Sequence, residues 1–292
     1  MPARPSEFEE KEYEAPLYNQ LERTSTGQVW SPGQVFERLV GIDRAIFLTD
    51  PALWRVLGFR QRRGIILEDI EWHFWKNRPR RQLPTFRLNL FIQAKRCFHH
   101  TERPRRFKRT ALASPCWHFD IEAHQQQALE QVAAKISRRA VVCYAAPAFH
   151  RCTELYGHTA AGTVNQNSTF PTVAKLKGHG AWYYDRPGGS GVANPDPEEI
   201  EGPDIFGLMD GLQRNGDGDY SLVGLSREID ESLFEVPADN PRRAIFFDRR
   251  NYVRAQLNQF DGVTDTFNGE VSAFFDIAVF SETFNLDWYV IK

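Results

Sequence analysis

A short apolar run in this chain ends in two polar residues that share one side of a strand. Residues 88–92 read Leu-Asn-Leu-Phe-Ile, and such bulky side chains predict a buried strand. The run continues as Gln93-Ala94-Lys95-Arg96. Because side chains alternate along a strand, Gln93 and Lys95 point to the same face. Burying an amide and a cation together is costly without partners, so we expect this strand end to line a polar site.

The pattern upstream predicts two further elements, each with an acid. Ser31-Pro32 is a helix-start signal, and apolar residues recur at helical spacing over residues 33–40, which places Glu37 on a helix. Residues 45–48 are apolar and predict a strand that opens at Asp43. We therefore expect a helix acid and a strand acid before the strand that ends in Gln93 and Lys95.

The pattern downstream predicts a helix over residues 121–135, a strand over 139–146 and a short helix over 150–156. Residues 178–203 are rich in Gly and Pro, which predicts a long loop and the end of the core. We predict three regions: an N-terminal extension over residues 1–27, a core over 28–190 with a basic insertion at about 50–85, and an acidic, then aromatic-rich region over 191–292.

The fragments Phe36-Glu37, Gly41-Ile42-Asp43 and Gln93-Ala94-Lys95-Arg96, in this order, resemble the PD-(D/E)xK nuclease superfamily. They are most similar to its Mrr-type restriction endonuclease branch, in which glutamine replaces the usual third acidic residue. The resemblance covers about residues 30–180. It implies an α/β fold with a restriction-endonuclease-like core, that is, a mixed central sheet flanked by helices, followed here by an extra C-terminal α+β region. The predicted order of helix, three strands, helix and strand fits that core.

The resemblance implies a role for each candidate residue in cleaving phosphodiester bonds of DNA. Asp43 would bind Mg²⁺ or Mn²⁺, and Gln93 would add its side-chain carbonyl oxygen, since hard cations prefer oxygen ligands. Glu37 would orient a metal-bound water or contact a second ion, and Lys95 would stabilise the attacking hydroxide. About fifty residues separate Asp43 from Gln93, so an insertion lies between them and Asp69 is a rival metal ligand.

Two functional classes follow from this resemblance. The first is a metal-dependent endonuclease that serves as the effector of a restriction or anti-phage defence system. Its partners would be DNA and an ATPase, a helicase or another defence-system subunit, and a homo-oligomer is also compatible. The alternative is a catalytically inactive, nuclease-like subunit that binds nucleic acid or has a structural role. The presence of Glu37, Asp43 and Lys95 favours the first class.

The formal net charge of −2 hides a strong separation of charge along the chain. Residues 60–109 hold fifteen Lys or Arg against four Asp or Glu, whereas residues 196–239 hold thirteen acids against two bases. A basic block around the predicted catalytic strand suits a polyanion, because phosphate neutralisation dominates nucleic-acid affinity. The predicted DNA-binding residues are Arg78, Arg80, Arg81, Arg96, Arg103, Arg105, Arg106, Lys108 and Arg109. The acidic segment could cover this basic surface as a DNA mimic or bind a basic partner.

Composition limits where such a protein would act. No apolar run approaches the length of a membrane span, and the acidic N-terminus lacks the pattern of a signal peptide, so we expect no membrane association. The four cysteines are irregularly spaced and include no Cys-x-x-Cys pair. We therefore expect reduced thiols and a cytoplasmic location.

Overall fold

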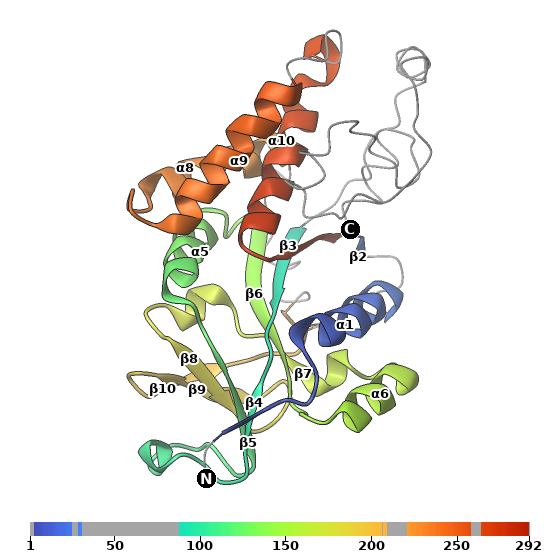
Figure 1. The fold of residues 1–292 in the computed structure, drawn as a ribbon, viewed down its shortest axis with the longest axis vertical. Helices are drawn as coiled ribbons and strands as arrows, with labels where there is room; N and C mark the ends of the chain where they lie inside the picture. Colours follow the sequence, from blue (N-terminus) through green and yellow to red (C-terminus); the bar gives the residue numbers. More distant parts are fainter. Residues whose placement is uncertain are drawn as a thin grey trace.

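Two β-sheets meet at the strand that carries Gln93. The computed structural model describes residues 3–24, 29–30, 88–205, 207–208, 221–257 and 264–291. Within these residues, one sheet has the strand order β2-β11-β3-β6-β7 and the other has the order β1-β4-β5-β8-β9-β10. Helices lie on both faces of the first sheet (Figure 1). The chain is thus an α/β protein in which helices flank a mixed sheet.

The first sheet is mixed. β3 pairs in parallel with β6 and antiparallel with β11, and β11 also pairs antiparallel with β2. Its strands are β2 (Val29–Trp30), β3 (Leu88–Ala94), β6 (Ala140–Pro147), β7 (Ser168–Thr169) and β11 (Asp287–Ile291). The predicted strands at 88–92 and 139–146 are therefore confirmed.

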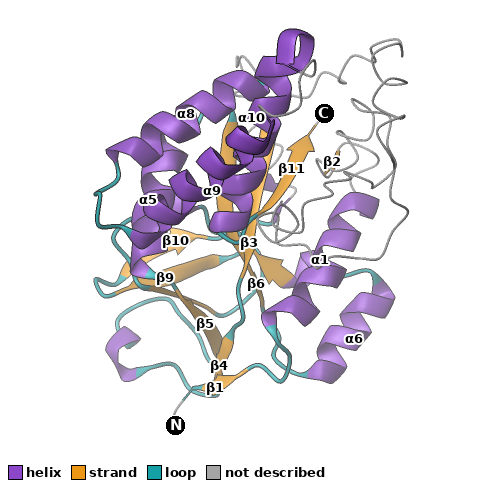
Figure 2. Ribbon diagram, turned by 45° about the horizontal axis from the view of Figure 1, so that its top comes forward, coloured by secondary structure: helices purple, strands orange, loops and turns teal. Residues whose placement is uncertain are grey.

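The helices form two layers, one on each face of this sheet (Figure 2). One layer holds α5 (Ala123–Lys135), α8 (Leu222–Glu235), α9 (Pro241–Leu257) and α10 (Thr264–Thr283). The opposite layer holds α1 (Glu10–Thr24) and α6 (Cys152–Ala161). The helices predicted over 121–135 and 150–156 correspond to α5 and α6. Short 3₁₀ turns lie at Arg105–Phe107, Asn165–Asn167 and Val173–Leu176. Among the described helices, none is long and apolar enough to cross a membrane.

β3 is apolar on both faces because both of its faces are covered. Leu90, Ile92 and Ala94 pack in the cluster beneath α1 and α6, whereas Phe91 packs in the cluster beneath α5 and α10. Burial on both sides explains why the run reads as continuous rather than alternating. These clusters provide the apolar contacts against which polar groups at the end of β3 are held.

The second sheet is antiparallel throughout. Its strands are β1 (Arg4–Pro5), β4 (Phe98–His100), β5 (Cys116–Asp120), β8 (Ala181–Tyr184), β9 (Ser190–Asn194) and β10 (Glu198–Glu201). Three residues, 95–97, join β3 to β4, so the chain passes from one sheet to the other directly after Gln93 and Ala94. The motif lies at the junction of the two sheets.

The prediction of a long loop over residues 178–203 is wrong. This segment contains β8, β9 and β10, which pair as consecutive antiparallel strands. Its Gly and Pro residues lie mainly in the turns, where Gly188 has a φ of 62°. Gly191 lies within β9, and an added Cβ there would lie 2.4 Å from the Trp182 ring, so a strand glycine permits this close packing.

Both ends of the described chain contribute to the core around β3. Tyr13, Leu17 and Leu21 of α1 are buried beside β3, and β11 lies between β2 and β3. Residues predicted as an N-terminal extension and as a separate C-terminal region therefore supply a helix and a strand to the same unit. The predicted division of the chain at residues 27 and 190 stays a prediction.

Charged side chains hold α8, α9 and α10 together. The Asp276 carboxylate on α10 accepts hydrogen bonds from Arg254 Nε and from Ser226 Oγ, each at 3.0 Å. Arg250 on α9 pairs with Asp230 on α8, and Arg254 lies 3.5 Å from the same carboxylate. The acids of α8 thus bind cations of neighbouring helices. Asp276 is 3% exposed, which makes it the most buried charge of this network.

Replacing Asp276 with alanine should destabilise the helical layer, because Arg254 would lose its buried partner. We expect a loss of about 2 kcal/mol in the free energy of unfolding, below the range for fully buried pairs because 41% of the Arg254 side chain is exposed. Glu231→Ala is the control, since the pairs that Glu231 makes with Lys135 and Arg227 are both solvent-exposed. Urea unfolding measures both variants, and equal losses would contradict the assigned role of Asp276.

Candidate active site at the junction of the two sheets

Gln93 and Lys95 lie at the end of β3, and their side chains meet groups of the same core cluster. Gln93 Nε2 donates to the Phe284 carbonyl at 3.3 Å, and Lys95 Nζ lies 5.4 Å from the centre of the Tyr144 ring. Both Phe284 and Tyr144 belong to the cluster beneath α5 and α10. The backbone N–H of Lys95 donates to the Ala145 carbonyl at 2.8 Å, which extends the pairing of β3 with β6 by one residue.

The Gln93 amide is buried with only one of its two ends bonded. Its side chain is anchored through Nε2, whereas Oε1 has no hydrogen-bond partner among the described residues. Gln93 is 3% exposed, so this oxygen carries a desolvation cost of about 1–3 kcal/mol. A carbonyl oxygen held in this way is a candidate acceptor or metal ligand.

The Lys95 ammonium is held among carboxylates at a partly buried position. Burial lowers the pKa of Lys95 below its ordinary value, and the charges of Glu10, Glu122 and Asp120 oppose this shift. Arg242 contributes a smaller lowering of the pKa. The pKa falls although three carboxylates attract the ammonium, so burial is the larger effect.

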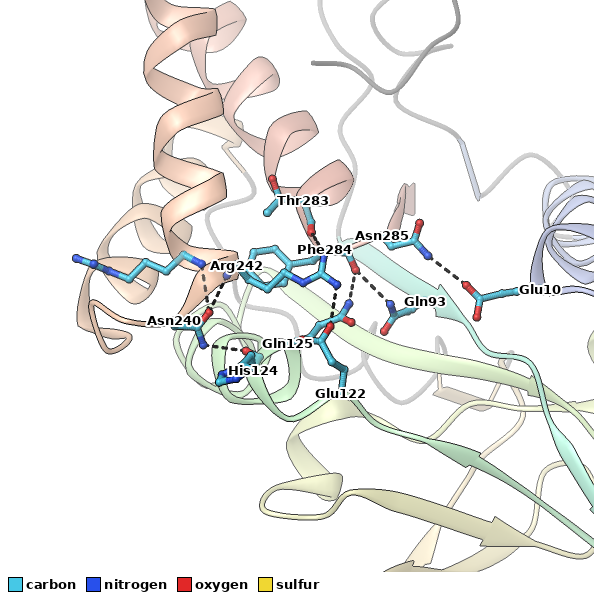
Figure 3. Close-up of polar contacts among 11 residues, drawn as sticks. Glu10, Gln93, Glu122, His124, Gln125, Asn240, Arg242, Thr283, Phe284 and Asn285 are labelled. Carbon is cyan, nitrogen blue, oxygen red and sulfur yellow. Dashed lines mark hydrogen bonds and ion pairs between the residues drawn. The ribbon is translucent and has the colours of Figure 1, made fainter. Parts of the chain in front are cut away.

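Glu10, in the first turn of α1, is a site residue that the sequence did not reveal. Burial raises the pKa of the Glu10 carboxyl, and the Lys95 ammonium opposes this shift. Asn285 Nδ2 donates to Glu10 Oε1 at 3.2 Å (Figure 3). The signal was present, since Tyr13, Leu17 and Leu21 recur at helical spacing directly after an acidic first turn.

A second group of polar residues approaches from the start of α5 (Figure 3). Gln125 Nε2 donates to the Phe284 carbonyl at 2.5 Å, so this carbonyl accepts both Gln125 and Gln93. Glu122 Oε2 accepts from Arg242 Nη2 at 2.7 Å, and Arg242 Nη1 donates to the Thr283 carbonyl at 3.1 Å. The end of α10 therefore connects β3 with the starts of α5 and α9.

Several predicted site residues lie outside the described residues, among them the predicted helix acid and both aspartates that are candidate metal ligands. They are Glu37, Asp43, Asp69, Arg78, Arg80 and Arg81. Within the described ranges, no group of three or more His, Cys, Asp or Glu side chains is arranged to hold a metal ion. The structure thus brings Gln93 and Lys95 together with Glu10 and Glu122, and the predicted carboxylate ligand stays a prediction.

Two of the predicted DNA-binding arginines donate to backbone carbonyls inside the protein. Arg96 forms an ion pair with Glu9 at 2.8 Å and donates to the Ser6 carbonyl at 2.7 Å. Arg103 donates to the carbonyls of Thr110 and Leu112 at 3.1 and 2.8 Å. These arginines hold backbone segments in place.

The remaining four described cations of the basic segment are all exposed, and one of them also contacts aromatic side chains. Arg106 donates to the Tyr183 hydroxyl and lies over the rings of Phe107 and Tyr183. The other exposed basic residues of this connection between β4 and β5 are Arg105, Lys108 and Arg109. They are the described members of the predicted DNA-binding set that fit contact with a phosphate backbone most directly.

Comparison with known proteins does not assign this site. No family model, no curated protein and no solved structure matches the chain. The chemistry of the described side chains therefore carries the functional argument.

Replacing Lys95 with methionine should raise stability at neutral pH. A lysine whose pKa is lowered by folding weakens the folded state at neutral pH, where the unfolded chain accepts the proton more readily. The variant should melt at a higher temperature than the wild type at pH 7, and the gain should shrink as the pH approaches 10.5, the ordinary value for lysine. Lys177→Met, at an exposed position, should change little. A lower melting temperature for Lys95→Met would show that the ammonium stabilises the fold.

Proposed function

We propose that this protein is a metal-dependent endodeoxyribonuclease of the PD-(D/E)xK superfamily, similar to the Mrr-type branch. The observation that carries the proposal is the orphaned carbonyl oxygen of Gln93, two residues before the partly buried Lys95 at the end of β3. Both groups lie at the end of a central strand in a mixed sheet with helices on each face. That placement is compatible with the restriction-endonuclease-like core that the motif implies.

The Gln93 side-chain oxygen suits a hard divalent cation, but a carboxylate ligand is needed beside it. Gln93 Oε1 is a buried oxygen without a partner in the described chain, and oxygen ligands are those that Mg²⁺ and Mn²⁺ prefer. Asp43 would complete the set, with Asp69 as the rival. The bound ion would supply a Lewis acid that activates water and neutralises charge on the phosphate.

The chain's own residues would divide the remaining tasks. Lys95 would place a positive charge beside the attacking water and the phosphate, where an ammonium stabilises developing negative charge. The Lys95 charge lowers the pKa of Glu10, so the two side chains interact electrostatically. Glu10 would orient the attacking water, which is the role that the sequence motif gives to Glu37. Gln93 would act as a neutral ligand that leaves the site more positive than a glutamate would.

The biological setting that fits this activity is restriction or anti-phage defence. A nuclease of this kind would need restraint, which an ATPase, a helicase, another defence-system subunit or self-association could provide. Three acids of α8 pair with Lys135 of α5, with Arg139 directly before β6 and with Arg250 of α9, so these acids are already occupied within the protein. Restraint by a DNA-mimicking segment is thus better sought in the other acidic residues of 196–239.

Plasmid cleavage in Mg²⁺ or Mn²⁺ tests the proposed activity. We expect cleavage by the wild type and losses on the order of 100-fold or more for Lys95→Ala and Asp43→Ala, because each removes stabilisation of the transition state. Lys177→Ala, which removes an exposed lysine, is the matched control. Equal cleavage by all variants would assign the activity to a contaminant. Binding without cleavage by any of them would favour the inactive, nucleic-acid-binding alternative.

The exposed cations between β4 and β5 should contribute to DNA affinity through phosphate contacts. Replacing Arg105, Lys108 and Arg109 together with alanine should weaken binding to all sequences alike. It should also reduce the slope of log K against log salt by about 2–3, since each phosphate contact contributes roughly 0.9. A control that neutralises Lys177 and Arg186 should leave the slope unchanged. Fluorescence anisotropy with duplex DNA measures both, and an unchanged slope in the triple variant would remove this segment from the binding surface.

A further inference from the structure

The helix α10 ends in a turn whose geometry requires a left-handed residue. The N–H of Leu286 donates to the Ser281 carbonyl at 2.8 Å, and the N–H of Asn285 donates to the Glu282 carbonyl at 3.2 Å. This pair of bonds defines a Schellman motif, in which the residue after the helix adopts a positive φ. Asn285 has a φ of 51°. Leu286 is buried in the cluster beneath α10, and an apolar residue at this position frequently accompanies the motif.

The identity of residue 285 is informative because glycine would suit this backbone better. Glycine adopts positive φ without steric cost, and asparagine is the less frequent choice at this position. Asparagine adds a side-chain amide. Asn285 Nδ2 donates a hydrogen bond to Glu10 Oε1 at 3.2 Å (Figure 3). In the proposed reaction, the Glu10 carboxylate orients the attacking water. The asparagine therefore connects the end of α10 with the start of α1.

The same turn also fixes the other half of the proposed site. The Phe284 carbonyl accepts Gln93 Nε2 at 3.3 Å, which determines where Gln93 Oε1 lies. Gln125 donates to the same carbonyl, and Arg242 donates to the Thr283 carbonyl, so the turn is held from α5 and α9 as well. These bonds satisfy carbonyls that the end of a helix leaves without intrahelical donors.

We propose that Asn285 is a positioning residue that orients the Glu10 carboxylate for the reaction at the Gln93–Lys95 site. The inference rests on the proposed nuclease function and deepens it. Asn285 acts through Glu10, so its effect on catalysis should depend on whether Glu10 is present.

Asn285→Gly separates the side chain from the backbone requirement. Glycine keeps the left-handed turn, so the melting temperature should stay at or above that of the wild type. Loss of the amide should lower kcat by about tenfold with KM for DNA unchanged, the effect expected of one hydrogen bond to a charged group. Asn251→Ala, an exposed asparagine on α9, is the control and should leave kcat and KM unchanged.

A double-mutant cycle with Glu10→Gln tests whether the two residues act together. If Asn285 works through Glu10, Asn285→Gly should cause no further loss of kcat in the Glu10→Gln protein. A tenfold loss that persists in that background, or no loss in the wild-type background, would overturn the proposal.

A measurement independent of activity separates this inference from the nuclease proposal. The side-chain NH₂ resonances of Asn285, assigned with Asn285→Gly, should shift in a ¹⁵N–¹H spectrum when Glu10→Gln is introduced. They should not shift with Glu199→Gln, which alters an exposed strand residue. Unmoved resonances in Glu10→Gln overturn the positioning contact. If the Asn285 resonances shift in Glu10→Gln but the wild-type protein cleaves no DNA, the contact between Asn285 and Glu10 is supported and the nuclease function is rejected.

Discussion

The backbone carbonyl of Phe284 is the acceptor on which the arrangement of the candidate site depends. It lies where α10 ends, and it binds the side-chain amides of Gln93 from β3 and Gln125 from α5. The next residue, Asn285, binds Glu10 from α1. Because the amide of Gln93 is held at its nitrogen, its oxygen cannot turn toward the same carbonyl. One turn thereby places polar groups that three separate elements supply.

These polar groups lower the stability of the folded protein at the end of β3. Gln93 Oε1 is buried without a partner in the described chain, and burial lowers the pKa of Lys95 against the attraction of nearby carboxylates. Both effects cost folding free energy, which the apolar clusters on the two faces of β3 offset. Unfavourable polar groups concentrated at one strand end are typical of a functional site, since a purely structural strand gains nothing from them.

Local patterns predicted the elements whose signals are local. β3 and β6 are continuous apolar runs, and α5 has helical spacing with good helix formers, so each was found. The segment 178–203 was misjudged because its strands are short and Gly and Pro mark the turns between them. Their stability comes from antiparallel pairing between segments, and that pairing cannot be read from any one of them. The helix α1 has a local signal as well, since Tyr13, Leu17 and Leu21 follow an acidic first turn at helical spacing.

The sequence by itself determined that residues 88–94 form a strand and that Gln93 and Lys95 share one side of it, because alternation along a strand follows from backbone geometry. It also determined that these two residue types are costly to bury. The tertiary structure alone decided their partners. Glu10 and Asn285 are 275 positions apart in sequence, and Gln93 and Phe284 are 191 apart. Only the placement of β11 next to β3, with α1 on one face and α10 on the other, brings these groups together, because hydrogen bonds form between neighbours in space.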